Sequence, residues 1–123
     1  MQHPEERIQA EYNKKMQENE EKLLGLEWRR EEMEKKEDAI SVVDKKFDLY
    51  LRRQEEAYIA DPKGAADLHN FKEEMFDEQR RTQLLLDEEW DALEAERKRL
   101  YREQEDFDNQ RRAALSAMKK DNK

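Results

Sequence analysis

Mostly apolar residues recur every seven positions along two long stretches of the chain. The first series holds Tyr12, Asn19, Leu26, Met33, Ile40 and Phe47, and the second holds Leu86, Leu93, Leu100, Phe107 and Ala114. A seven-residue repeat places side chains on one stripe of an α-helix and is typical of coiled coils. We therefore expect two helices that pack through a hairpin seam of Leu26, Met33, Ile40, Phe47, Leu86, Leu93, Leu100 and Phe107.

The companion positions of the same heptads are much more polar. They hold Met16, Leu23, Arg30, Glu37, Asp44 and Leu51 in the first stretch, and Phe76, Gln83, Trp90, Arg97, Gln104 and Arg111 in the second. A half-polar seam buries little apolar surface to offset the conformational entropy that is lost when so many residues become ordered. The sequence therefore predicts a hairpin that is marginally stable by itself.

One break divides the pattern, at Ala60-Asp61-Pro62-Lys63-Gly64. Proline disfavours helical geometry at the residue before it, and glycine permits unusual dihedral angles. We expect a single all-α domain over 1–123, an antiparallel two-helix hairpin with a helix at 4–60, an apex at 61–66 and a helix at 67–118. Asp61 and Pro62 also fit the N-cap and first position of the second helix, with Asp67 as an alternative cap. In this register Phe47 would face Arg80 and Gln83.

Further apolar residues lie off the seam and gather towards the apex. A contiguous exposed apolar patch usually marks an interaction surface. We expect partner helices to complete a helical bundle with the hairpin, through a surface formed by Val43, Tyr50, Tyr58, Phe71, Met75, Leu85 and Trp90. The partner helices could come from a second copy of this chain, as a homodimer, or from a different protein.

Composition and charge narrow the class of protein. Charged residues make up 47% of the chain and the net charge is −8, with acids and bases interleaved, so nucleic-acid binding is not expected. The longest apolar runs, such as 84–86, are too short for membrane insertion. The chain has no cysteine, which is compatible with a reducing cytoplasm.

The sequence offers little for catalysis or metal binding. Its two histidines, His3 and His69, belong to no metal-ligand motif, and its two glycines are too far apart for a phosphate-binding loop. Two packed helices also lack the cleft that a catalytic pair of carboxylates needs. We expect no cofactor, no metal and no enzymatic activity.

The second helix carries a run of alternating basic and acidic residues, Glu96-Arg97-Lys98-Arg99-Leu100-Tyr101-Arg102-Glu103-Gln104-Glu105-Asp106, followed by Gln110-Arg111-Arg112. This run resembles the signature of a small family from Gram-positive bacteria, formerly a domain of unknown function, whose members are encoded beside LXG-domain toxins. The resemblance covers most of the chain. It includes the aromatic-rich middle from Phe47 to Tyr58 and the short break.

The resemblance implies a targeting factor or chaperone. Such a protein binds the helical N-terminal LXG domain of a toxin, together with a second small WXG100-like protein, for type VII secretion. It would be a cytoplasmic protein that could be exported with its client. Trp28 and Trp90 lie inside the predicted helices and form no Trp-x-Gly turn, so this chain is not expected to be the WXG100-like member itself.

Tyr101 and Glu105 fit the Tyr-x-x-x-Asp/Glu pattern associated with type VII export. With 33 acidic residues and four tyrosines, the same match arises readily by chance. Two other functions fit the helical pattern equally well. One is a stalk of the type III or flagellar secretion apparatus, and the other is a homodimeric coiled coil that acts as a spacer.

Overall fold

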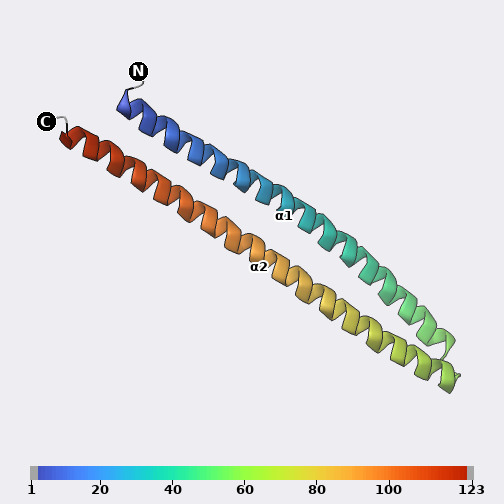
Figure 1. Cartoon of the computed structure of the whole chain (residues 1–123). Coiled ribbons are helices and arrows are strands. Elements are labelled where there is room, and N and C mark those ends of the chain that lie inside the picture. Colours follow the sequence, from blue (N-terminus) through green and yellow to red (C-terminus); the bar gives the residue numbers. More distant parts are fainter. Residues whose placement is uncertain (1–2, 122–123) are drawn as a thin grey trace. The chain divides into compact units, whose positions relative to one another are not determined.

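The computed structural model describes residues 3–121, which form two α-helices and no strand. Helix α1 spans Pro4–Ala57 and helix α2 spans Pro62–Asp121, with a short turn between them (Figure 1). Proline fits the first helical position of α1 because the N–H that it lacks would have no partner there, and Glu5 and Glu6 complement the positive end of the helix dipole. The prediction of an all-α helical hairpin is confirmed.

The turn is shorter than the sequence pattern suggested. The Gly64 N–H donates to Asp61 Oδ1 at 3.1 Å, and the Ala65 N–H donates to the Asp61 carbonyl at 2.9 Å. Asp61 is thus the N-cap of α2, and the helix begins at Pro62 rather than at residue 67. The expected apex at 61–66 is wrong because this cap starts the helix early, and α1 also ends before residue 60, at Ala57.

Gly64 owes its place to a close approach. Neither glycine has a positive φ. A Cβ at Gly64 would lie 2.5 Å from Cδ1 of Tyr58 and 2.9 Å from Oδ2 of Asp61. Only glycine therefore leaves room for the tyrosine ring against the first turn of α2.

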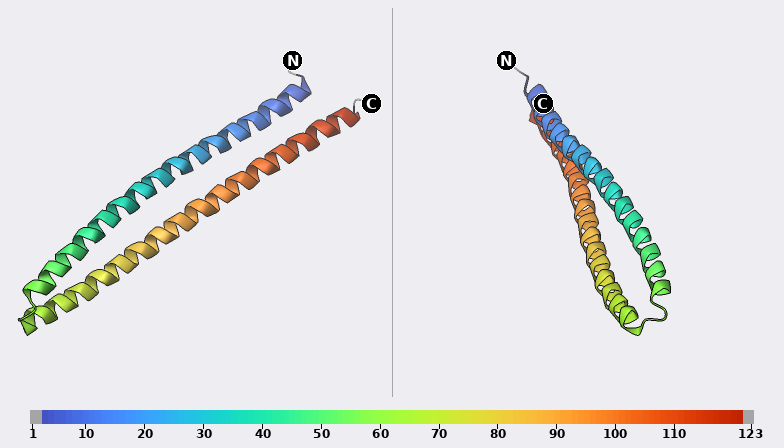
Figure 2. Two further views of the ribbon diagram at one scale, coloured as in Figure 1. Left: turned by 180° about the vertical axis from the view of Figure 1, so that it is seen from behind. Right: turned by 90° about the vertical axis from the view of Figure 1, so that its right-hand side faces the viewer.

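The chain divides into two compact units, which we describe separately. The terminal unit combines residues 1–30 with residues 92–123, and the apex unit consists of Glu31–Asp91 with the turn at its centre. In both views of Figure 2, the turn joins the end of α1 to the start of α2, so the two helical segments of the apex unit run in opposite directions.

Each unit has a thin core on the predicted seam. In the terminal unit Asn19, Leu93 and Leu100 are buried, and Leu26 and Phe107 are half-buried. In the apex unit the buried residues are Met33, Leu51 and Leu86, and Ile40 and Phe47 are half-buried. All eight predicted seam residues thus have restricted exposure, and the burial of Asn19 and Leu51 adds two positions to the predicted seam.

The register of the apex unit differs from the expected one. The ring of Phe47 meets the ring of Phe71 edge-on, with 6.0 Å between the ring centroids. Phe71 lies nearer the start of α2 than Arg80, which was expected to face Phe47. The shift follows from the early start of α2, because a shorter turn pairs each α1 residue with a residue nearer the turn.

Candidate partner-binding surface

Exposed large apolar side chains are concentrated in the apex unit. Among the described residues, ten of them lie there: Val42, Val43, Leu49, Tyr50, Tyr58, Ile59, Phe71, Phe76, Leu84 and Leu85. The terminal unit has three, namely Leu24, Trp28 and Tyr101. An apolar surface of this extent on one part of a protein is typical of an interaction site.

An apolar groove runs between the two helical segments of the apex unit. Its volume is about 450 Å³, and its lining residues are Lys36, Ala39, Ile40, Val43, Asp44 and Phe47 of α1 with Met75, Glu78, Gln79, Thr82 and Gln83 of α2. The groove lies between the buried Met33 and Leu51 along α1. It can therefore receive a side chain at the centre of the unit.

Polar seam residues explain why the helices leave this groove open. Asp44 and Gln79 are half-buried, and Gln79 Nε2 donates to Asp44 Oδ1 at 3.1 Å. A pair of leucines at these positions would interdigitate and close the seam, as in a regular coiled coil. The carboxylate and the amide instead satisfy each other across the seam, and Val43 beside them stays 62% exposed.

Five of the seven residues predicted to bind partners belong to one surface. Val43 and Met75 line the groove itself. Residues three, four or seven positions apart share a helix face, so Tyr50 extends the stripe from Val43, Phe71 extends it from Met75, and Leu85 extends it from Thr82. We call Val43, Tyr50, Phe71, Met75 and Leu85 the groove face.

Trp90 and Tyr58 have partners within the apex unit. Trp90 is half-buried, and its indole N–H donates to the carboxylate of Glu37 across the two helices. The ring of Tyr58 packs against Gly64 at the turn. These contacts place both aromatic rings against the hairpin and the turn, and their part in partner binding stays a prediction.

Two buried positions lie outside the eight residues of the predicted seam. Leu51 is 3% exposed. It belongs to the companion series, whose preceding members Arg30, Glu37 and Asp44 are charged, so the series as a whole did not indicate a buried position. Asn19 is 1% exposed, and its Nδ2 donates to the carbonyl oxygen of Leu100 at 3.0 Å. Its place in the apolar heptad series was the signal that could have identified it.

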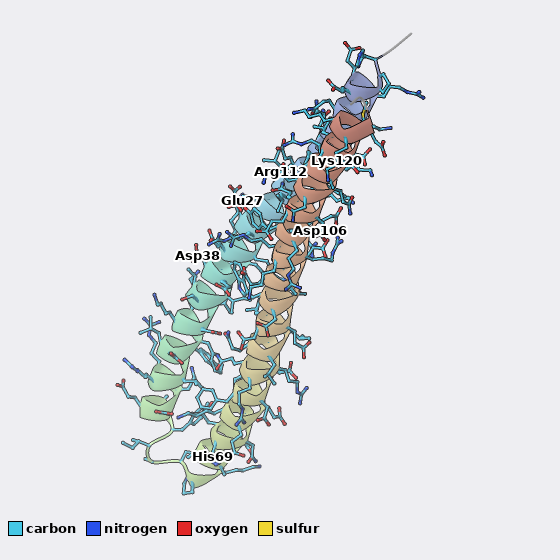
Figure 3. All side chains as sticks on the ribbon, turned by 90° about the vertical axis from the view of Figure 1, so that its left-hand side faces the viewer. Glu27, Asp38, His69, Asp106, Arg112 and Lys120 are labelled. Carbon is cyan, nitrogen blue, oxygen red and sulfur yellow. The ribbon has the colours of Figure 1, made fainter. Side chains whose placement is uncertain are left out.

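The two units differ in charge. Residues 31–91 contain 19 acidic and 10 basic residues, whereas residues 1–30 and 92–123 together contain 14 acidic and 15 basic residues. Figure 3 shows charged side chains projecting from both helices, with His69 close to the turn. Two ion pairs connect the helices of the apex unit: Lys36 Nζ lies 3.6 Å from Glu89 Oε1, and Lys72 Nζ lies 2.9 Å from Glu55 Oε1.

Tyr101, the tyrosine of the possible export pattern, contacts an arginine of its own helix. The Arg97 guanidinium carbon lies 5.6 Å from the centroid of the Tyr101 ring. The hydrogen bond to Tyr101 raises the pKa of the Arg97 side chain, with a further contribution from the charge of Glu94. Tyr101 and Glu105 are both exposed, so each side chain is accessible in the terminal unit.

Histidine and acidic side chains do not cluster in the described part of the chain in the way that a metal site needs. Over residues 3–121, no group of three or more histidine and acidic side chains is placed to hold a metal ion. His69 Nε2 lies 3.1 Å from Glu73 Oε1, one helical turn away.

The same part of the chain contains no helix that is both long and apolar enough to cross a membrane.

Comparisons of this chain with protein-family models, with curated proteins and with solved structures find no match. The groove face, the charge of the apex unit and the sequence run at 96–112 are therefore the features of this chain that bear on its function.

Proposed function

We propose that this chain is a non-enzymatic targeting factor or chaperone that binds the helical N-terminal LXG domain of a toxin for type VII secretion. The observation that carries the proposal is the groove face, where apolar side chains from α1 and α2 surround an open groove. Helices recognise partner helices by inserting apolar side chains into such grooves. The family resemblance of residues 96–112 supplies the identity of the client.

The arrangement fits a protein that completes a helical bundle. A partner helix on the groove face would cover Val43 and Leu85, which are 62% and 61% exposed. Covering them removes apolar surface from water, which is favourable by about 25 cal/mol of free energy per Å² of apolar surface buried. In the proposed assembly a second small WXG100-like helical protein joins the toxin domain and this chain, which is cytoplasmic or leaves the cell with its client.

Co-expression of the full chain with the toxin's N-terminal domain, with and without the small WXG100-like protein, tests the proposal. We expect a stable complex on size-exclusion chromatography with light scattering, and higher helix content and melting temperature than for the chain alone. Absence of a complex under both conditions would refute the targeting function. Stimulation of a secretion ATPase by the chain would instead favour the stalk of a type III or flagellar apparatus.

Matched variants locate the contact. Val43→Glu places a carboxylate in the groove, whereas Val42→Glu makes the same change at the next residue, about 100° around the helix. Val42 is 52% exposed, similar to Val43, so the two variants should have similar stability as free chains. We expect loss of the complex with Val43→Glu and retention with Val42→Glu. Equal loss with both variants would contradict the assignment of the groove face.

A homodimer is the competing occupant of the same surface. It would bury the groove face against a second copy and leave the toxin domain unbound. Light scattering on the chain alone distinguishes the two cases: a concentration-independent dimer that Val43→Glu converts to a monomer would support the spacer function instead.

A further inference from the structure

We infer that the partner segment seated in the apolar groove is an amphipathic helix with a large apolar anchor flanked by lysine or arginine residues. The inference takes the groove face from the proposed function and adds the chemistry of the occupant. It does not depend on the occupant being a toxin domain.

The groove has room for a large apolar side chain. Its volume of about 450 Å³ lies within the range of about 300 to 1,000 Å³ that is common for pockets that bury small ligands. The anchor would lie against Val43, Phe47 and Met75, which supply apolar contacts from both helices. Long charged side chains of the partner can bury their apolar stems against the groove and keep their charged ends at the rim.

The α2 rim of the groove face is acidic. Asp67 lies four residues before Phe71, Glu74 lies three residues after it and Glu78 lies seven residues after it. At these spacings all three carboxylates share the helix face of Phe71. Glu78 is itself a lining residue of the groove and is paired with Arg81, at 2.8 Å, on its solvent side. These carboxylates favour a cationic flank on a helix that lies along the groove.

Other charges of the apex unit reinforce this negative potential. Lys36, the basic residue that lines the groove, is already paired with Glu89. Beyond Ile40, Asp44 and Gln83, a second hollow of about 460 Å³ contains four carboxylates and one lysine in its lining: Glu37, Asp38, Asp44, Asp48 and Lys45. Charges within a Debye length of about 10 Å act on an approaching helix, so both hollows attract a basic segment.

The same charges argue against a second copy of this chain as the occupant. Two apex units would each carry the excess of 19 acidic over 10 basic residues, and their approach would bring like charges together. The terminal unit of a second copy is nearly neutral but exposes few large apolar side chains, namely Leu24, Trp28 and Tyr101. Neither unit matches an acidic apolar groove as well as a basic amphipathic helix does.

Two synthetic peptides test the inference on the full chain. Both have leucines at the same heptad positions over about three heptads, and one has lysine and the other glutamate at every polar position. We expect the Leu/Lys peptide to bind at least about tenfold more tightly than the Leu/Glu peptide at low salt, with the difference shrinking as salt is raised. Equal affinities would overturn the inference.

Matched variants separate the groove from the general charge of the protein. Glu78 and Asp77 are adjacent, and each is paired with an arginine three residues further on, Arg81 and Arg80. Glu78→Lys should weaken Leu/Lys binding about fivefold, and Asp77→Lys should change it less than about twofold. Similar losses from both variants would mean that the whole unit, and not the groove, attracts the peptide.

A second pair of variants tests the apolar anchor. Val43→Asn should weaken the Leu/Lys peptide about tenfold while Val42→Asn leaves it unchanged, with circular dichroism confirming that both variants stay helical. A dimer of the free chain that Val43→Asn dissociates would assign the groove to a second copy and overturn the inference. Binding of the Leu/Lys peptide without binding of the toxin domain would refute the targeting function alone, and the reverse result would refute only the basic character of the occupant.

Discussion

The terminal and apex units share one heptad pattern, but it gives a closed seam in the terminal unit and an open groove in the apex unit. In the terminal unit the seam buries Leu93, Leu100 and Asn19, the charges are nearly balanced, and few large apolar side chains face solvent. In the apex unit Asp44 and Gln79 open a groove in the seam, acids outnumber bases, and most of the exposed large apolar side chains are found. A polar residue on a seam can thus open a binding surface in one unit and order the packing in the other.

The largest effect is expected when alanine replaces one leucine in each unit. Leu100 is 0% exposed, so Leu100→Ala should lower the free energy of unfolding by about 2 to 5 kcal/mol. Leu85 is 61% exposed, so Leu85→Ala should change it by less than about 0.5 kcal/mol while weakening partner binding. Urea unfolding followed by circular dichroism measures both changes. A strongly destabilised Leu85→Ala chain would mean that the groove face is part of the core.

The two glycines provide the next test, because one lies in each unit. A Cβ at Gly64 would collide with Tyr58 and Asp61, so Gly64→Ala should destabilise the chain by about 1 to 3 kcal/mol. Gly25 has nothing within 4 Å of the place a Cβ would take, so Gly25→Ala should stabilise α1 by about 1 kcal/mol. Thermal unfolding of both variants checks the opposite signs. A neutral Gly64→Ala variant would show that the Tyr58 ring moves aside at little cost.

Asn19 tests whether a buried polar group orders the terminal unit. Its Oδ1 is buried without a hydrogen-bond partner among the described residues, and an unsatisfied polar atom costs about 1 to 3 kcal/mol. Asn19→Leu should therefore raise stability by about 1 kcal/mol, yet it should loosen the register, because a seam asparagine selects one alignment of the helices.

Distances between spin labels measure the register. The chain has no native cysteine, so a double variant with cysteine at the exposed positions Lys14 and Glu105 carries spin labels at these two sites alone. We expect one narrow distance distribution in the parent chain and a broader or double one with Asn19→Leu. An unchanged narrow distribution would show that the remaining seam residues determine the register without Asn19.

The heptad pattern predicted most of the fold but less of the site. Repeats such as Leu86-Leu93-Leu100 encode which helix face is buried, and this information is local in the sequence. The start of α2 was predicted too late because Asp61 and Asp67 are both suitable N-caps, and spacing alone does not decide between them. The hydrogen bond from Gly64 to Asp61 shows that Asp61 is the cap. The groove depends on where the α1 residues meet α2, so it could not be predicted before the Phe47–Phe71 contact established the register.

The smallest expected effect is a pH dependence from one surface ion pair of the terminal unit. Arg99 donates from Nη2 to Glu96 Oε1 at 2.5 Å and from Nε to Glu96 Oε2 at 2.9 Å, and these hydrogen bonds hold the pKa of Glu96 below its ordinary value of 4.5. A lowered pKa in the folded chain means that the pair stabilises the fold above pH 4.5 and that this contribution disappears as the pH falls through the pKa of the folded state. Glu96→Gln should therefore melt slightly below the parent chain at neutral pH, and the two melting temperatures should converge in acid. Because Glu96 and Arg99 are close to solvent, high salt should also reduce the difference at neutral pH, and a difference that persists in both acid and high salt would point to packing by Glu96 rather than to its charge.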